Sequence, residues 1–249
     1  MKLVWSFEKI EDGTLCITDY KGEDYDIVIP EYIGENKVSG IAAYTFSPQK
    51  PHIRKEQRWF LEHISSITIP DSVMSIGEYA FAGCKGLSSI TIPNGVTNIK
   101  RGWFRGCECL TKITISANVT TIGDSAFEDC FAFTSINIPN SVISIGHSAF
   151  TSCLLLTSID VPDSVTSIGD FAFSGCPNLI NVTLHDGLTS IGAYAFGWCE
   201  SLTKITIPES VMTIEDSAFE ECKNLTLYSR NGGSAERYAK ENNIPFVAE

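Results

Sequence analysis

The feature that most constrains this chain is a strict repeat of 23 residues, the spacing between Phe81 and Phe104. Each repeat has a phenylalanine at one fixed position, and a cysteine follows it three residues later. They are Phe81, Phe104, Phe127, Phe150, Phe173, Phe196 and Phe219, with Cys84, Cys107, Cys130, Cys153, Cys176, Cys199 and Cys222. Repeats of this kind stack on one another and share one continuous core. We therefore expect a single solenoid domain for all 249 residues.

Each repeat contains an alternating x-Ile-x-Ile segment, the pattern of a strand with one buried face. The expected inward pairs are Ile67/Ile69, Ile90/Ile92, Ile113/Ile115, Ile136/Ile138, Ile159/Val161, Val182/Leu184 and Ile205/Ile207. Next, Val-x-x-Ile-Gly predicts a second short extended segment, with the glycine allowing a tight bend, and Ala-Phe predicts a single helical turn. Rungs stacked at about 4.8 Å predict a right-handed, mostly β solenoid with a parallel sheet on one side.

The N-terminal part departs from the period. Residues 1–25 predict a β-hairpin cap, because Leu3, Trp5 and Phe7 alternate with polar residues before a turn. A cap is needed to cover the open first rung of a solenoid. The remaining chain divides into a diverged first repeat at 26–46, a basic insertion at 47–63, seven 23-residue repeats at 64–227 and a C-terminal cap at 228–249.

The C-terminal cap is expected to contain a helix and a last strand. Ser234 is the expected N-cap of the helix, because a serine hydroxyl can accept a hydrogen bond from the first turn. The strand follows around Phe246. Together they are expected to cover the final rung.

The cysteines are expected to be reduced and buried rather than disulfide-bonded. Seven of the nine share one repeat position, so they stack on one face, and an odd number cannot pair uniformly. Disulfides remain the alternative. A row of thiols one rung apart is not a tetrahedral cage, so no metal site is expected. Cys16 and Cys109 lie off the row and are the expected reactive thiols.

Composition excludes several classes of function. The net charge of −12 opposes nucleic-acid binding, which requires basic surface, and opposes adsorption to anionic membranes. No apolar run is long enough to span a membrane. The apolar run at the N-terminus is too short for a signal peptide, so we expect either a cytoplasmic protein or one that has lost a leader.

No catalytic motif is present in the sequence. It has no phosphate-binding glycine loop, no His-Glu-x-x-His and no Gly-x-Ser-x-Gly. We therefore expect no enzymatic activity and no cofactor, with dispersed catalytic residues as a minor alternative. Acidic residues gather on the turns, as at Asp124 and Glu128. They fit a solvated edge better than a calcium site, because no loop brings several oxygens to one point.

The insertion at 47–63 is one candidate binding site. Residues 54–63 predict a short helix, with Trp59 and Phe60 packing back on the solenoid. Arg54 and Arg58 lie on the same segment, and arginine and tryptophan are frequent at binding hot spots. The positive segment either binds an acidic partner or pairs with the chain's own acidic repeats.

A second candidate is an apolar strip. Phe131, Leu154 and Leu155 occupy turn positions that are polar in the end repeats, and Trp198 lies two rungs further along. An exposed apolar patch marks an interface, and this one predicts weak self-association. The alternative is local packing against the turn.

The outward positions of the main strands form a polar field of mostly hydroxyl and amide side chains. Lys112 and Lys204 are its cationic members. Such a field fits a shallow protein-binding surface, and it equally fits a sheet that is only solvated.

One full unit runs from Cys153 to Phe173 and reads Cys-x-x-Leu-x-x-Ile-x-Val-Pro-x-x-Val-x-x-Ile-Gly-x-x-Ala-Phe. This unit resembles the BspA-like leucine-rich repeats of the LRR_5 type. The resemblance implies a non-enzymatic role in protein–protein binding or adhesion, often on a bacterial surface and toward host or extracellular matrix proteins. It implies no catalytic residues. The chain departs from the pattern in having no visible export signal and in carrying the 47–63 insertion. A structural or self-associating spacer is the alternative role.

Overall fold

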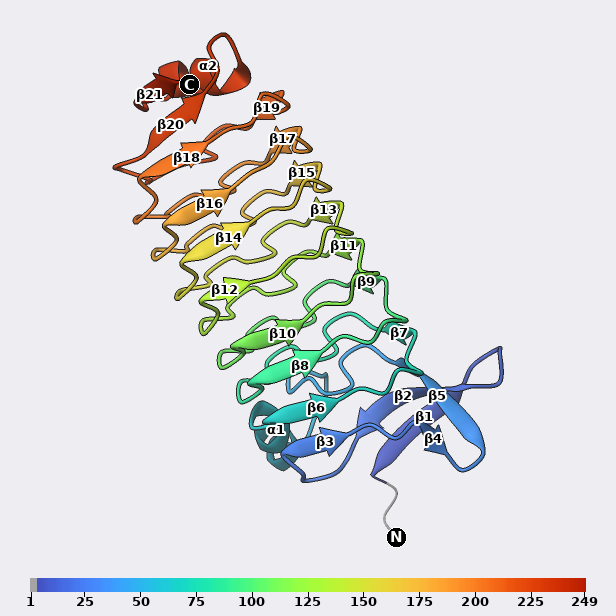
Figure 1. The fold of residues 1–249 in the computed structure, drawn as a ribbon. Helices are drawn as coiled ribbons and strands as arrows, with labels where there is room; N and C mark the ends of the chain where they lie inside the picture. The colour runs from blue at the N-terminus through green and yellow to red at the C-terminus, as the bar shows by residue number, and fades with distance from the viewer. Residues whose placement is uncertain (1–3) are drawn as a thin grey trace.

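The computed structural model describes residues 4–249 and shows an elongated, mostly β solenoid whose ends lie far apart (Figure 1). Leu3, which was expected in the first hairpin strand, lies outside the described residues. The predicted architecture, a mostly β solenoid with a hairpin cap and a helix–strand cap, is confirmed.

The main sheet consists of one short strand from each rung. Its strands are β3 (Asp26–Val28), β6 (Ser66–Thr68), β8 (Ser89–Thr91), β10 (Lys112–Thr114), β12 (Ser135–Ile136), β14 (Ser158–Asp160), β16 (Asn181–Thr183), β18 (Lys204–Thr206), β20 (Thr226–Ser229) and β21 (Phe246–Ala248). All pairings in it are parallel. The pairing is interrupted between β10 and β12 and between β16 and β18.

Among the seven 23-residue repeats, those of β10 and β16 have no proline directly after the main strand. Both interruptions follow these two strands. In these rungs Ile113, Ile115, Val182 and Leu184 are only half-buried, as is Ile69 elsewhere, so the expectation of full burial fails at these positions. The other inward residues of the predicted pairs are buried.

The second extended segment of each repeat forms a sheet of its own. The strands are β7 (Ser75–Ile76), β9 (Asn98–Ile99), β11 (Thr121–Ile122), β13 (Ser144–Ile145), β15 (Ser167–Ile168), β17 (Ser190–Ile191) and β19 (Thr213–Ile214). Strands β9 to β19 pair in parallel, and β7 pairs with β5 (Asn36–Ile41). Strand β5 also pairs with the short β4 (Tyr32–Ile33).

The glycine after these strands has a second role besides the predicted bend. Gly169 begins the turn in which the Ala172 N–H bonds to its carbonyl at 3.3 Å, and it does so without a positive φ. A Cβ at Gly169 would lie 2.7 Å from the carbonyl carbon of Gly146 on the preceding rung. The glycine therefore lets neighbouring rungs approach closely.

A column of phenylalanine rings fills the core. From Phe46 to Phe219, ring centroids on successive rungs are 5.1 to 5.7 Å apart and nearly parallel. The Ala-Phe step forms a single turn, in which the Cys153 N–H bonds to the Phe150 carbonyl at 3.4 Å. From Phe46 to Phe196, the N–H of each phenylalanine in the column bonds to a carbonyl of the next rung, as Phe150 does to Ala172 at 2.7 Å.

The hairpin of β1 (Trp5–Lys9) and β2 (Leu15–Tyr20) lies at the first rung. Strand β2 pairs in parallel with β5, and the Trp5 ring contacts Tyr20 at 4.8 Å and Phe46 at 6.3 Å. The hairpin thus covers the first ring of the phenylalanine column.

The last rung is covered by α2 (Ser234–Glu241) and β21. The hydroxyl of Tyr238 accepts the Phe219 N–H at 3.3 Å, in place of the carbonyl that a further rung would supply. The predicted role of Ser234 as N-cap is wrong: Gly233 is the N-cap, and the Ser234 hydroxyl donates to the Val211 carbonyl.

Candidate protein-binding surfaces

Helix α1 (Lys55–Glu62) forms from the predicted segment, but its orientation differs from the prediction. Leu61 is the side chain that is buried against the solenoid, whereas Trp59 is 48% exposed and Phe60 is half-buried. The expectation that Trp59 packs back is therefore wrong. A helix has one buried face, and Leu61 occupies it.

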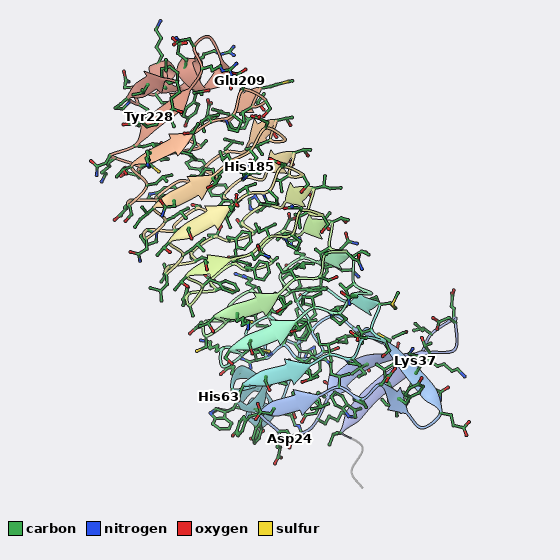
Figure 2. All side chains as sticks on the ribbon, in the orientation of Figure 1. Asp24, Lys37, His63, His185, Glu209 and Tyr228 are labelled. Atoms are coloured by element: carbon green, nitrogen blue, oxygen red, sulfur yellow. The ribbon has the colours of Figure 1, made fainter. Side chains whose placement is uncertain are left out.

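Exposed aromatic rings gather at α1. The Trp59 ring stacks on His63 at 4.3 Å and meets Tyr25, which precedes β3, at 6.1 Å. Tyr25 also contacts Phe60 at 6.0 Å. His63 projects at the N-terminal end of the molecule (Figure 2).

The cations of the insertion differ in their partners. Lys50 pairs with Asp19 at 2.9 Å and ties the insertion to the hairpin. Arg54, Lys55 and Arg58 are exposed, and none forms an ion pair within residues 4–249. Pairing with the chain's own carboxylates, the alternative derived from the sequence, therefore holds only for Lys50.

The apolar strip is present at Leu154 and Leu155, which are 41% and 51% exposed. Phe131 is half-buried on the preceding rung, and its carbonyl accepts the Leu155 N–H at 3.2 Å. Ile180, 48% exposed, lies on the next rung and was missed. The exposure of Ile180 could have been predicted from the sequence, because Ile180 stands where most other repeats have serine or threonine. We call Leu154, Leu155 and Ile180 the leading-edge patch.

Two shallow grooves lie on the main sheet. One, of about 290 Å³, is lined by Lys112, Thr91 and Thr114 among others. The other, of about 350 Å³, lies beside the interruption between β16 and β18 and includes Ile180 and Lys204. Tyr228 on β20 also lines this groove (Figure 2). The second groove thus adjoins the leading-edge patch.

Trp198 belongs to a different group. It is 41% exposed and stacks on Tyr194 at 5.6 Å, and Tyr194 stacks on Phe171 at 4.9 Å. This stack lies on the turns that carry the Ala-Phe steps. Trp198 therefore lies on a different side of the rung from the apolar strip in which the sequence analysis placed it.

The cysteine row is reduced and buried, as predicted. Each thiol donates to the carbonyl of a phenylalanine on the preceding rung, as Cys176 does to Phe150 at 3.3 Å. Burial raises the pKa of every thiol in the row, to about 12 at Cys176 and to about 11 at Cys222. Cys109 is exposed, while burial and nearby Glu8 raise the pKa of half-buried Cys16.

The described residues hold no group of three or more His, Cys, Asp or Glu side chains with the geometry of a metal site. Within residues 4–249, no helix has the length and apolar character needed to cross a membrane. His185 contacts Asp160 at 2.8 Å and Asp163 at 3.4 Å on an exposed turn.

A family model described as the BspA type leucine rich repeat region, with six copies, matches residues 56–156 and 120–231. The leucine-rich repeat protein of Treponema pallidum shares 27% identity over 81% of this chain and 89% of that chain, with a TM-score of 0.71. A leucine-rich repeat protein from Bacteroides ovatus shares 24% identity over 99% of this chain and 66% of that chain, also with a TM-score of 0.71, which shows the fold alone. No curated protein matches the sequence.

Proposed function

The chain belongs to the BspA-type leucine-rich repeat family, and on that premise we propose that it is a non-enzymatic module that binds a protein partner. Leucine-rich repeats of this kind are interaction or structural repeat modules. The resemblance implies adhesion, with host or extracellular matrix proteins as the partner class. The proposed binding surface combines α1 with the main sheet.

The observation that carries the proposal is the exposed face of α1. The chain has a net charge of −12, but Arg54, Lys55 and Arg58 carry positive charge with no carboxylate partner among residues 4–249, and Trp59 is exposed beside them. Arginine and tryptophan dominate binding hot spots. A local positive field on an acidic body attracts an acidic surface and raises its association rate. We therefore propose an acidic region on the partner.

The main sheet supplies the rest of the surface. Its outward side chains are mostly small and polar, with Lys112 and Lys204 as exposed cations beside the two grooves. Beside the second groove, the leading-edge patch of Leu154, Leu155 and Ile180 adds apolar area. An apolar centre with a polar rim is the usual anatomy of a protein interface.

The test is a binding comparison of three immobilised proteins: the wild type, R54E/R58E, and K9E/K240E as a control with the same change of net charge. Lys9 and Lys240 are exposed outside the proposed surface. Extracellular-matrix and cytoplasmic extracts are passed over each protein. We expect the wild type and the control to retain the same proteins and R54E/R58E to lose them. Equal retention by all three would contradict the role of α1.

A spacer is the second candidate. It is favoured by the unbroken phenylalanine column, which Trp5 covers at one end and Tyr238 at the other. A chain of this kind is stiff and needs no partner surface. If the wild type retains no protein from any extract, the spacer role is supported and the binding role fails.

A further inference from the structure

A second surface with unusual chemistry lies on the Ala-Phe turns near the C-terminal end. The rings of Phe171, Tyr194 and Trp198 stack there in sequence, and the outer face of the stack is the 41% exposed Trp198. The other rungs place smaller or polar residues at the position of Trp198, including Gly83, Gly106 and Ser152. Tyr44 and Tyr79 stack in the same way at the N-terminal end of the solenoid, at 5.1 Å, and near the C-terminal end Trp198 adds a third ring to the stack.

These aromatic residues occupy a backbone conformation that disfavours them. Phe171, Tyr194 and Trp198 have φ values of +58°, +54° and +57°. Bulky side chains rarely adopt this left-handed region, and glycine adopts it readily. The other rungs have the same conformation at these positions, as at Tyr79 with a φ of +55° and at Ser152 with a φ of +59°, so the conformation belongs to the repeat. What is particular to this site is that three aromatic rings occupy it.

Carboxylates occur on the same turns as the stack, because Asp170 precedes Phe171 in the chain and Glu215, Asp216 and Glu220 belong to the turn of the following rung. The Trp198 N–H bonds to the Glu220 carbonyl at 2.7 Å, which places Glu220 on the adjacent rung. Asp170, Glu215, Asp216 and Glu220 are exposed, and none forms an ion pair in the part of the chain that the structure describes. We call the three rings and these four carboxylates the acidic aromatic surface. It fits a basic group that also stacks on an aromatic ring.

The chain itself carries a surface of the opposite charge on α1. Arg54, Lys55, Arg58 and Trp59 are spaced i, i+1, i+4 and i+5, so they form one contiguous exposed strip of the helix. The two surfaces cannot meet within one molecule, because α1 lies beside β3 at one end and the acidic aromatic surface lies near β17 and β19 at the other (Figure 1).

We propose that α1 of one copy docks on the acidic aromatic surface of a second copy. Arg54 and Arg58 pair with the carboxylates, and one cation stacks on the face of Trp198. Because the two surfaces differ, the contact is head-to-tail and leaves one free surface of each kind, so it extends to chains. The inference rests on the proposed function in one respect: it uses α1 and names a second copy as a partner.

Sedimentation velocity over a concentration series tests this contact at ionic strengths of about 0.01 M and about 0.15 M, where charges act over about 30 Å and about 8 Å. The variants are R54E/R58E and E215K/E220K, with E11K/E35K, at exposed sites elsewhere, as a control that matches the charge change of E215K/E220K. We expect the wild type and E11K/E35K to associate at low salt, and each of the other two variants to remain monomeric. An equimolar mixture of R54E/R58E and E215K/E220K is expected to associate, because each reversed surface then meets an opposite charge.

The substitution W198G separates the aromatic contact from the charges. Glycine accepts the left-handed backbone, so the fold is retained, and we expect association to weaken by about tenfold. A monomeric wild type at low salt, or a monomeric mixture, would overturn the inference. So would association that survives both charge reversals and is lost only in F131S/L154D, since that would place the contact at the strip and not at α1.

The same variants distinguish this inference from the proposed function. E215K/E220K leaves α1 and the main sheet unchanged, so it is expected to retain extract proteins while losing self-association. Retention of extract proteins with no self-association in any condition would overturn the second-copy contact alone. Self-association without any retained protein would overturn the proposed function alone.

Discussion

The seven buried thiols make the protein sensitive to alkaline pH. In an unfolded chain a cysteine thiol ionises with a pKa near 9.0, whereas burial raises the pKa to about 12 at Cys176 and to about 11 at Cys222. The other five thiols of the row shift in the same direction for the same cause. Above pH 9 the unfolded chain therefore releases protons that the folded chain keeps, and the free energy of unfolding falls.

The magnitude follows from the linkage relation. Between pH 8 and pH 10, one thiol that ionises only in the unfolded chain lowers the free energy of unfolding by roughly 1 kcal/mol. Seven such thiols lower it by several kcal/mol, which is a large part of the whole stability of an ordinary domain, about 5 to 15 kcal/mol. The stabilising contribution is fully present below pH 9 and is lost as the pH rises toward the folded-state pKa values.

Urea unfolding with a reductant present, at pH 7.5, 8, 9 and 10, measures this effect. We expect the wild-type midpoint to fall steeply between the last two values. Cys176→Ala lowers stability at pH 7.5 because it leaves a cavity, but it is expected to reduce the loss between pH 8 and pH 10 by roughly 1 kcal/mol. Cys109→Ala, at an exposed position, is the matched control. An unfolding free energy that stays constant from pH 8 to pH 10 would refute the reasoning.

Three further predictions concern the core and the caps. Phe150→Ala is expected to lower the free energy of unfolding in urea by about 3 to 5 kcal/mol, because the ring is fully buried and stacked at 5.1 and 5.2 Å on its two neighbours. A smaller loss than that of Phe131→Ala, at a half-buried position, would contradict the stabilising role of the phenylalanine column. Tyr238→Phe is expected to cost about 1 to 3 kcal/mol, because it removes the acceptor of the Phe219 N–H, and faster amide exchange at Phe219 would locate the effect. Gly175→Ala is expected to cost about 1 kcal/mol, because φ is +67° while a Cβ would meet only ordinary contacts at 3.7 Å or more; thermal unfolding that matches the wild type would show that the turn adapts.

Much of the fold could be predicted because one side chain recurs every 23 residues. A residue at a fixed repeat position must appear once on each rung, so burial of one phenylalanine or cysteine implies burial of all of them. The seven cysteines of the row are accordingly buried and free, and the phenylalanines form one column. Both caps were also predictable, because the ends of the array break its period.

The candidate surfaces were only partly predictable. Leu154 and Leu155 are exposed as expected, because they replace polar residues at a turn position. Ile180 was missed, although it interrupts a column of mostly serine and threonine. Trp198 was assigned to the same strip, but its ring stacks on Tyr194 on another side of the rung.

The sequence by itself determined the rung, its stacking and its buried set, because periodicity assigns each residue a position within a repeat. Only the tertiary structure decided what lies between rungs: the Cys176 thiol bonded to the Phe150 carbonyl, the Tyr238 hydroxyl replacing a missing rung, and α1 turning Leu61 inward and Trp59 outward. These contacts depend on side-chain direction and on the neighbour across a gap of about 4.8 Å. The repeat period of the sequence gives neither the direction of a side chain nor the identity of its neighbour on the next rung.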